Sequence, residues 1–323
     1  MRGQEGEIMK KIILDCDPGM DDSMAIVMAV KSPELDVLGI TAVNGNYPVD
    51  VTEKNARKVL ELLGETHIPV ARGMANPIIR NSPGDPFTHG EDGQAEAYLP
   101  EPKMALSDLD AVDLIISLVK ENPGEVTLIA TGPMSNIAMA MRKAPEIKGM
   151  IPEIIAISGM FGLNDSAFLN ATGDTPQSEW NVYVDPEAAK VVYESGVKLT
   201  ALGLDVATYF DVDFTEDEIA LLEKSSKKEA AFLANAIRFV KGRGFGAYCT
   251  VIDCMAVAYA IDPTLVETIE AHVGVETKDG LTLGMTVIDR RHHFVWEQLP
   301  LINVGKKADC GRFLKLLLDL VLH

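Results

Sequence analysis

The chain has 323 residues, enough for one large α/β domain or two small ones. Its formal net charge of -19, from 48 acidic and 29 basic residues, argues against binding to nucleic acid or to anionic membrane surfaces. It has neither a run of about eighteen apolar residues nor an apolar signal segment near the N-terminus, so we expect a cytoplasmic protein without membrane contact. The four cysteines lack C-x-x-C spacing, and we expect them to be free and buried.

Strands and helices alternate along the first half of the chain. In order, we expect a strand at 11–14, a helix at 21–32, a strand at 35–43, a helix at 51–64 and a short strand at 68–71. A polar segment follows at 73–107, and a loop of that length in a compact domain is usually functional. Ser107 is then expected to cap a helix that ends at Glu121.

The second half continues the alternation. In order, we expect a strand at 126–130, a helix from 135 or 136 to 143, a strand at 154–158, an irregular segment at 159–179, a helix at 185–195, a strand at 199–204, helices at 215–225, 227–241 and 253–260, a β-hairpin of 273–276 and 283–288, and a helix at 308–322. Strands separated by single helices imply mostly parallel pairing. We therefore predict one Rossmann-like α/β domain over residues 1–323, with helices flanking the sheet, a small appended hairpin and a disordered extension at 1–9.

Four aspartates follow the first predicted strand within eight residues, namely Asp15, Asp17, Asp21 and Asp22. Carboxylates this close repel one another and raise each other's pKa unless a cation lies among them. We therefore expect a hard metal ion at the carboxyl end of the first strand, where open α/β sheets bind their ligands.

Three alternatives explain less of this pattern. Acidic residues are favoured at helix N-termini, which accounts for Asp21 and Asp22 but not for Asp15 and Asp17. An EF-hand loop also begins Asp-x-Asp, but Gly19 stands at a ligand position. A haloacid-dehalogenase-type phosphohydrolase usually has Thr or Val in place of Gly19, and it gives the second aspartate pair no role.

The motif Asp-x-Asp-Pro-Gly-x-Asp-Asp after an apolar strand resembles that of the inosine–uridine-preferring nucleoside hydrolase family. The resemblance covers nearly the whole chain in the family order, through residues 41–46 (TAVNGN), 89–93 (HGEDG), 131–138 (TGPMSNIA), 179–181 (EWN) with 185–189 (DPEAA), and Asp253 with 256–259 (AVAY). It implies hydrolysis of the N-glycosidic bond of a ribonucleoside to ribose and a free base.

The resemblance also implies a metal site. Asp17, Asp22 and Asp253 would ligate a calcium ion together with the backbone carbonyl of Thr131, and Asp15 would orient these ligands from behind. Ligation by oxygen alone fits Ca²⁺ better than zinc or copper.

Further roles follow from the same resemblance. Asp21, Glu179 and Asn181 would hydrogen-bond the ribose hydroxyls, Asn46 would orient the nucleophilic water, and Asp17 would take a proton from that water as general base. A cluster of carboxylates also suits this reaction, because positive charge develops at the anomeric carbon.

The residues around the base and the 5′-hydroxyl depart from the family pattern. Ile252 stands where many members carry a His that protonates the departing base, so we expect His89, from the long loop, to serve as the acid. Trp180 is expected to contact the substrate, since some relatives stack the base on aromatic rings. At 173–176 (GDTP), where the family often has an Asn for the 5′-hydroxyl, Asp174 or Asn170 is expected to replace it.

Two other functions remain open beside a calcium-dependent hydrolase of nucleoside salvage. A protein that keeps the ribose site but lacks the usual acid could bind nucleosides without cleaving them. A hydrolase of a non-standard N-riboside would carry the same motifs. The resemblance further implies a homodimer or a homotetramer.

Overall fold

The computed structural model describes residues 9–85, 87–208 and 213–323, so residues 1–8 of the predicted disordered extension lie outside the described residues. The strands are β1 (Lys10–Cys16), β2 (Leu35–Ala42), β3 (Val70–Arg72), β4 (Thr127–Ala130), β5 (Ile154–Ile157), β6 (Leu199–Leu202), β7 (Val266–Val275), β8 (Thr286–Asp289) and β9 (Leu301–Ala308). The α-helices are α1 (Met20–Lys31), α2 (Val49–Leu63), α3 (Ala111–Glu121), α4 (Ser135–Lys143), α5 (Asp165–Leu169), α6 (Trp180–Val184), α7 (Pro186–Tyr193), α8 (Leu204–Ala207), α9 (Glu216–Lys224), α10 (Lys228–Gly242), α11 (Cys254–Ile261) and α12 (Cys310–Leu322). Short 3₁₀ helices lie at η1 (Pro145–Gly149), η2 (Ala247–Thr250) and η3 (Pro263–Leu265).

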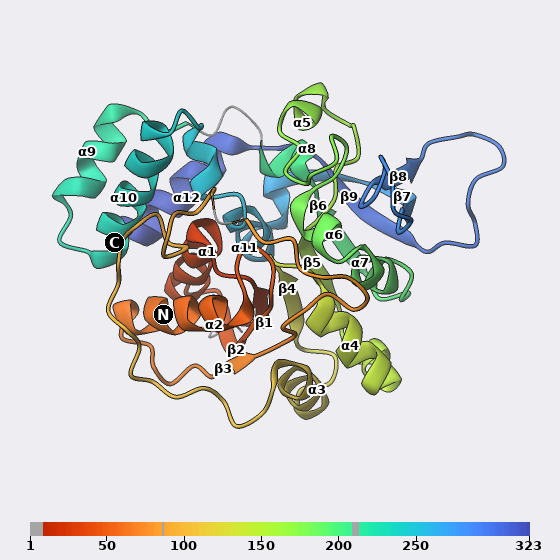
Figure 1. Cartoon of the computed structure of the whole chain (residues 1–323), viewed down its shortest axis with the longest axis horizontal. Helices are drawn as coiled ribbons and strands as arrows, with labels where there is room; N and C mark the ends of the chain where they lie inside the picture. Colours follow the sequence, from red (N-terminus) through yellow and green to blue (C-terminus); the bar gives the residue numbers. More distant parts are fainter. Residues whose placement is uncertain (1–8, 86, 209–212) are drawn as a thin grey trace, which may run out of the picture.

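In the described part of the chain, the strands form one sheet in the order β3-β2-β1-β4-β5-β6-β9-β7-β8. The pairs from β3 to β9 are parallel, whereas β7 pairs antiparallel with both β9 and β8. This mostly parallel sheet flanked by helices confirms the predicted fold class. Figure 1 shows the sheet running across the molecule, with β7 to β9 at its right-hand end.

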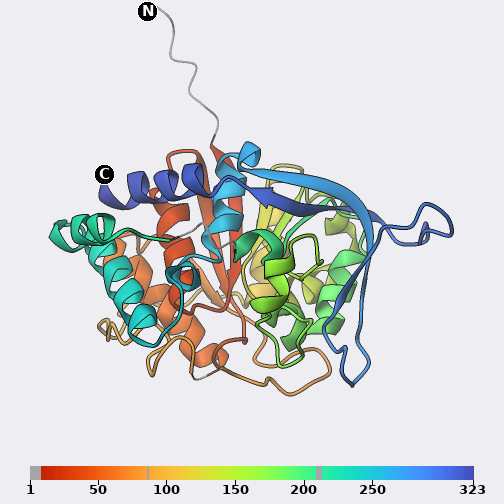
Figure 2. The same cartoon turned by 90° about the horizontal axis from the view of Figure 1, so that it is seen from above.

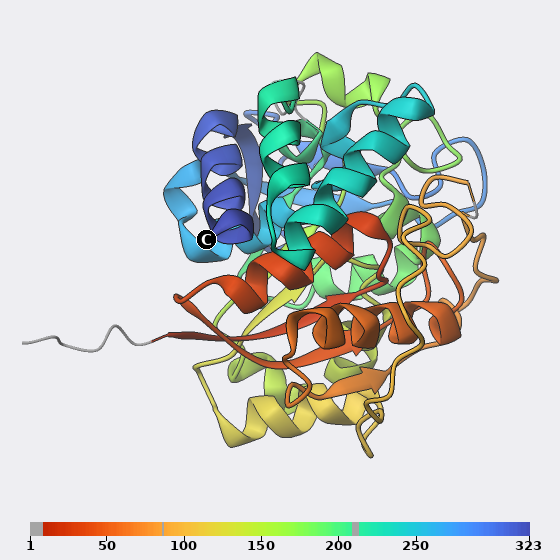
Figure 3. The same cartoon turned by 90° about the vertical axis from the view of Figure 1, so that its left-hand side faces the viewer.

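Two hydrophobic cores cover the two faces of the sheet. Alternation along β1 sends Ile12 and Leu14 into one core and Ile13 into the other. Helices α1, α2, α10, α11 and α12 cover the first core, and α3, α4 and α7 cover the second. Figure 2 shows these layers from above, and Figure 3 looks onto the face formed by α1, α2, α10 and α12. Burial on both sides explains why the central strands are apolar almost throughout.

Several boundaries differ from the sequence-based expectations. The predicted hairpin exists as β7 and β8, but β7 begins at Val266, and the strand β9, absent from our expectation, joins it to β6. Gly305 and the lysine pair that follows it hide the apolar alternation of β9. Helix α3 begins later than expected, because Asp110, and not Ser107, accepts the hydrogen bond from the Asp113 amide that caps it.

Strand order also fixes where a ligand can bind. From β1 the chain turns to β2 and β3 on one side, and β4 to β6 follow on the other, so the order reverses at the β1/β4 pair. In open α/β sheets such a reversal opens a crevice at the carboxyl ends of the strands. Asp15 pairs with both Thr41 and Ala130 in the sheet, so Asp17 and Thr131 emerge side by side at that point.

Candidate active site

Asp17 follows the end of β1 and is almost completely buried. Its Oδ2 accepts a hydrogen bond of 2.6 Å from the backbone amide of Asn46, while its Oδ1 is buried without a partner among the described residues. A Cβ at Gly45 would clash with this carboxylate, so the loop after β2 can approach Asp17 only with glycine there. Two strand ends thus hold one carboxylate at the crevice.

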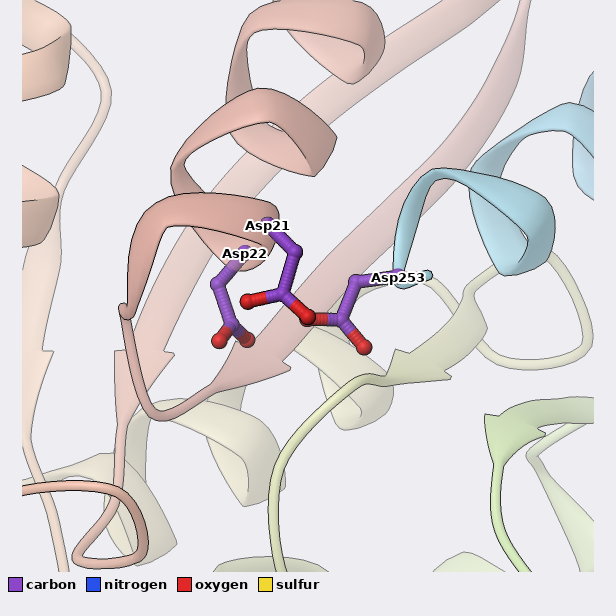
Figure 4. Close-up of side chains that lie close together, drawn as sticks. All are labelled: Asp21, Asp22 and Asp253. Atoms are coloured by element: carbon purple, nitrogen blue, oxygen red, sulfur yellow. The ribbon is translucent and has the colours of Figure 1, made fainter. Parts of the chain in front are cut away.

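Three further carboxylates come together beside Asp17. Oxygen atoms of Asp21, Asp22 and Asp253 lie within 4.8 Å of one another. Figure 4 shows Asp21 and Asp22 projecting from the first turn of α1 toward Asp253, which stands at the start of α11. We call Asp17, Asp21, Asp22 and Asp253 the acidic floor. Residues from opposite ends of the sequence therefore form one cluster.

Short hydrogen bonds fix Asp22 within the acidic floor. Its Oδ1 accepts from the Thr131 hydroxyl at 2.8 Å, and its Oδ2 accepts from the Gly19 amide at 3.2 Å. The Thr131 carbonyl, expected to be a ligand, accepts a 2.7 Å hydrogen bond from the side chain of Asn181, which leaves its second lone pair for an ion. The resemblance assigned Asp21 only to the ribose hydroxyls, but its carboxylate also lies within the cluster of Asp22 and Asp253.

Asp15 lies behind the acidic floor. Its Oδ1 accepts from Thr41 at 2.5 Å and from Asn136 at 2.8 Å, and its Oδ2 is buried without a partner among the described residues. The Asn136 amide also reaches the Ala42 carbonyl. These hydrogen bonds tie the ends of β1 and β2 to the start of α4.

Burial dominates the electrostatics of these carboxylates. It raises the pKa of Asp17 and Asp253 well above the ordinary value, and the negative charges of neighbouring aspartates raise both further. Burial likewise raises the pKa of Asp15, Asp22 and Glu179 to about 7 and that of Asp21 to about 6. Carboxylates held this close remain ionised at neutral pH only if a cation offsets their repulsion.

The donor set fits a hard divalent cation. It consists of carboxylate oxygens together with the Thr131 carbonyl, and one oxygen of Asp17 and one of Asp21 are buried and unpaired within the described ranges. Such oxygens are the ligands of Ca²⁺ and Mg²⁺, whereas zinc and copper sites usually include His or Cys.

A cavity of about 390 Å³ opens above the acidic floor. Most predicted site residues line it, namely Asp21, Asn46, His89, Thr131, Asn170, Glu179, Trp180, Asn181 and Asp253. Asp17 and Asp22 lie buried beneath it. Asp174 does not line the cavity: its side chain is exposed and forms a hydrogen bond with Tyr183. The structure thus assembles the predicted site without Asp174.

The cavity also includes residues that sequence reasoning did not assign. Among them are Asp85 and Thr88 from the long loop, and Thr208 after α8. In the sequence, only the proximity of Asp85 and Thr88 to His89 pointed to the site. Nothing in the sequence pointed to Thr208. Phe245, Tyr248 and Ile252 also line the cavity, so the segment before Asp253 reaches it.

His89 is buried and its ring orientation is fixed. The Met20 backbone amide donates to its Nδ1 at 3.3 Å, and Nδ1 lies 3.6 Å from an Asp21 oxygen. Burial lowers the pKa of His89 and so favours the neutral ring, in which an accepting Nδ1 leaves the N–H at Nε2. A Cβ at Gly19 would lie 2.5 Å from Nδ1, so glycine at this position is required by the histidine.

Glu179 and Asn181 are positioned by the short helix α6. The Glu179 carboxylate caps this helix, accepting from the amides of Asn181 at 2.7 Å and Val182 at 3.1 Å, and it also accepts from Gly159 at 3.1 Å. The Asn181 amide donates to the Thr131 and Ile157 carbonyls, so its orientation is set by the ends of β4 and β5.

Comparisons with known proteins agree with this architecture. Residues 12–315 match the family model described as inosine-uridine preferring nucleoside hydrolase. The chain is 37% identical over 311 residues to a pyrimidine-specific ribonucleoside hydrolase, RihA, of Escherichia coli O1:K1 / APEC, covering 95% of this chain and 97% of that protein.

Two solved structures are also similar. A plant nucleoside hydrolase, PpNRh1, has a TM-score of 0.86 and 30% identity over 98% of this chain and 99% of its own. A purine-preferring ribonucleoside hydrolase from Gardnerella vaginalis has a TM-score of 0.83 and 32% identity over 97% of this chain and 98% of its own. The chain belongs to the inosine–uridine-preferring nucleoside hydrolase family and is an enzyme, a glycosidase that acts on N-glycosyl bonds.

Proposed function

We propose that this enzyme hydrolyses uncharged ribonucleosides to ribose and a free base, and that it depends on a calcium ion. One observation carries the proposal: buried carboxylates from both ends of the chain meet at the base of a cavity that is lined by the expected ribose-binding residues.

Asp22, Asp253, Asp17 and the Thr131 carbonyl would hold the ion, and Asp21 is close enough to the same cluster to share it. When bound, the ion would offset the repulsion among these carboxylates and act as a Lewis acid toward ribose hydroxyls and water. The hydrogen bonds to Asp22 from Thr131 and Gly19 keep that carboxylate oriented whether or not the ion is present.

Asp17 acts as the general base in this proposal. Its unpaired Oδ1 is the oxygen available to take a proton from the attacking water, because its Oδ2 is occupied by the Asn46 amide. The side chain of Asn46 lines the cavity next to Asp17 and would orient that water. Asp21, Glu179 and Asn181 would bind the ribose hydroxyls, and the negative charge of Asp21 and Glu179 would stabilise the ribosyl cation.

His89 would assist the departing base by donating a hydrogen bond from Nε2–H, because a neutral imidazole is too weak an acid to give up that proton. The Met20 amide holds Nδ1 as an acceptor, which leaves Nε2–H as the donor. Ile252 lines the same cavity and contributes only apolar surface. We call His89, Phe245, Tyr248 and Ile252 the base wall.

Charge argues for nucleosides over nucleotides. The described lining includes Asp21, Asp85, Glu179 and Asp253 but no Lys or Arg. A 5′-phosphate, which carries up to two negative charges, would be repelled by these groups and would find no basic partner.

The decisive experiment measures reducing-sugar release from a panel of nucleosides, with and without a chelator. Because one similar protein is named pyrimidine-specific and another purine-preferring, the panel contains uridine, cytidine, inosine, adenosine and a nicotinamide riboside. Chelator-sensitive release from any of the first four supports the proposal, whereas release from the cationic nicotinamide riboside alone would favour a hydrolase of a non-standard N-riboside. Thermal stabilisation by nucleosides without sugar release would favour the alternative of a nucleoside-binding protein.

The proposed function is accompanied by two predictions about the whole protein, one on its location and one on its assembly. None of the described helices is both long and apolar enough to cross a membrane. A cytoplasmic location and a homodimeric or homotetrameric assembly remain predictions, which fractionation and sedimentation would test.

A further inference from the structure

A carboxylate that the proposed mechanism does not use lies three residues after His89. Asp92 is not among the residues that line the active-site cavity. Its Oδ1 accepts hydrogen bonds from the backbone amides of Gln94 at 2.8 Å and Glu96 at 2.9 Å, and its Oδ2 accepts from the amide of Tyr98 at 2.7 Å. One side chain therefore organises the backbone of the segment that follows it.

These hydrogen bonds stabilise a strained backbone. Ala95, Glu96 and Tyr98 have φ values of 58°, 55° and 46°, in the left-handed region that residues with a Cβ rarely adopt. Residues in this region persist only where surrounding contacts fix them. The amides that donate to Asp92 lie within and directly before this run, so we expect the segment to leave the left-handed conformation when the carboxylate is removed.

The strained turn returns to His89. The Ala95 amide donates to the His89 carbonyl at 2.8 Å, and the Gly93 amide donates to the Gly90 carbonyl at 3.2 Å. The Gly90 carbonyl also accepts from the hydroxyl of Tyr47. The backbone of His89 is therefore joined directly to the turn, and the position of its ring depends on where the turn holds that backbone.

The backbone of Asp92 is anchored independently of its carboxylate. Its carbonyl accepts a 3.1 Å hydrogen bond from the side chain of Asn55, on α2, which also donates to the Pro18 carbonyl at 3.1 Å. Pro18 directly precedes Gly19, whose missing Cβ leaves room for the His89 ring. A side-chain substitution at Asp92 leaves these contacts available, so we expect its effect to be confined to the turn and to His89.

Building on the proposed function, we propose that Asp92 is a positioning residue for His89. Its carboxylate holds the turn at 92–98 in the left-handed conformation, and the turn holds the His89 ring where Nε2–H can donate to the departing base. Asp92 acts only through His89 and contacts neither the substrate nor the ion.

The test compares Asp92→Ala with the wild type on two substrates: the nucleoside that the wild type cleaves fastest, and a nitrophenyl riboside, whose leaving group needs no hydrogen bond. We expect kcat/KM to fall about thirtyfold for the nucleoside and less than about threefold for the nitrophenyl riboside, because only the first reaction depends on His89. Glu91→Gln, which removes a negative charge from the neighbouring exposed residue, is the control and should leave both values near wild type.

A double-mutant cycle shows whether the effect passes through His89. In the His89→Ala background, Asp92→Ala should lower kcat/KM for the nucleoside by less than about threefold, because the side chain that it positions is already absent. A further loss of about thirtyfold in that background would overturn the proposal. Equal losses on the nucleoside and the nitrophenyl riboside would assign Asp92 a purely structural role and overturn it too, as would unchanged activity on both.

Asp92→Asn covers the case in which Asp92→Ala does not fold. It keeps the shape of the side chain and one accepting oxygen, so at least one backbone amide loses its acceptor. We expect the same pattern at a smaller scale, with a loss of about fivefold for the nucleoside and less than about twofold for the nitrophenyl riboside. Equal values for the two substrates would again contradict the proposal.

A failure of the proposed function is recognisable separately, because the wild type would then release no sugar from any substrate. The position of His89 is in that case followed by NMR of protein that carries isotope-labelled histidine, in which the His89 signals are identified by their absence from His89→Ala. We expect Asp92→Ala and Asp92→Asn to shift these signals and Glu91→Gln to leave them unchanged. His89 signals that are the same in the Asp92 variants as in the wild type would overturn the proposal.

Discussion

The acidic floor and the base wall belong to the same cavity but are built in different ways. The floor consists of side chains that follow the carboxyl end of β1 or stand at the starts of α1 and α11, and all of them are buried. The base wall comes from the 73–107 loop and from the region after α10, where Phe245 is 38% exposed. In the proposed mechanism, ribose binding would therefore depend on residues held at the central sheet, and base binding on residues of the loops.

Removal of the proposed ion should have the largest effect on activity, because it affects the whole acidic floor. We expect a chelator to abolish turnover and added Ca²⁺ to restore it. The chelated protein should also lose stability as pH rises from about 4 to about 7, because burial raises the pKa of Asp15, Asp22 and Glu179 to about 7 and the folded state therefore binds more protons than the unfolded state in that range.

Thermal melting at several pH values, with and without Ca²⁺, checks the sign of this effect. The stability that these groups contribute is present below the unfolded pKa and is lost as pH passes the folded pKa. A chelated protein that became more stable over this range would contradict the electrostatics described for the acidic floor.

Asp17→Asn should have the next largest effect. It keeps the shape of the side chain but removes the general base and a negative charge, so we expect kcat to fall about a thousandfold. Asp319→Asn, on the exposed side of α12, is the matched control and should match the wild type. Near-native turnover of Asp17→Asn would remove this residue from the mechanism.

His89→Ala tests the base wall. We expect kcat/KM for uridine or inosine to fall about a hundredfold, because the departing base loses its donor, whereas a nitrophenyl riboside, which needs no proton, should lose far less. His67→Ala, at an exposed position before β3, is the control. Equal losses on both substrates would exclude His89 as the donor to the base.

Ile252→His in the His89→Ala background sharpens this test. Ile252 lines the cavity beside Asp253, so a His there would present a second donor to the base, and we expect about tenfold recovery of uridine or inosine hydrolysis. Ile252→Leu should give no recovery. If neither variant recovers activity, protonation from this side of the cavity does not assist departure.

The smallest effect is expected at Arg243. Its guanidinium lies 4.3 Å from the Phe239 ring centroid and 5.1 Å from that of Phe87, and it pairs with Glu96 at 3.5 Å. It therefore links the two loop regions next to the base wall. We expect Arg243→Met to raise KM about threefold and to leave kcat nearly unchanged, since exposed contacts of this kind are weak. A large fall in kcat in steady-state assays would mean that these loops also position the acidic floor.

Much of this architecture was predictable because it depends on local patterns. The central strands are continuous apolar runs, and helices such as α2 follow with a 3.6-residue period. Strand β9 was missed because its residues Gly305, Lys306 and Lys307 have no pattern of their own and pair only once β6 and β7 are in place. The short helices α5, α6 and α8 fall below the length at which periodicity is informative.

The sequence by itself determined the acidic motif, its place after the first strand and the oxygen-rich donor set, because adjacent residues cannot be separated by folding. Only the tertiary structure decided that Asp21 joins Asp22 and Asp253 and that Asp174 does not line the cavity. These facts depend on which side chains long-range packing brings within hydrogen-bond distance, and no local pattern encodes that distance.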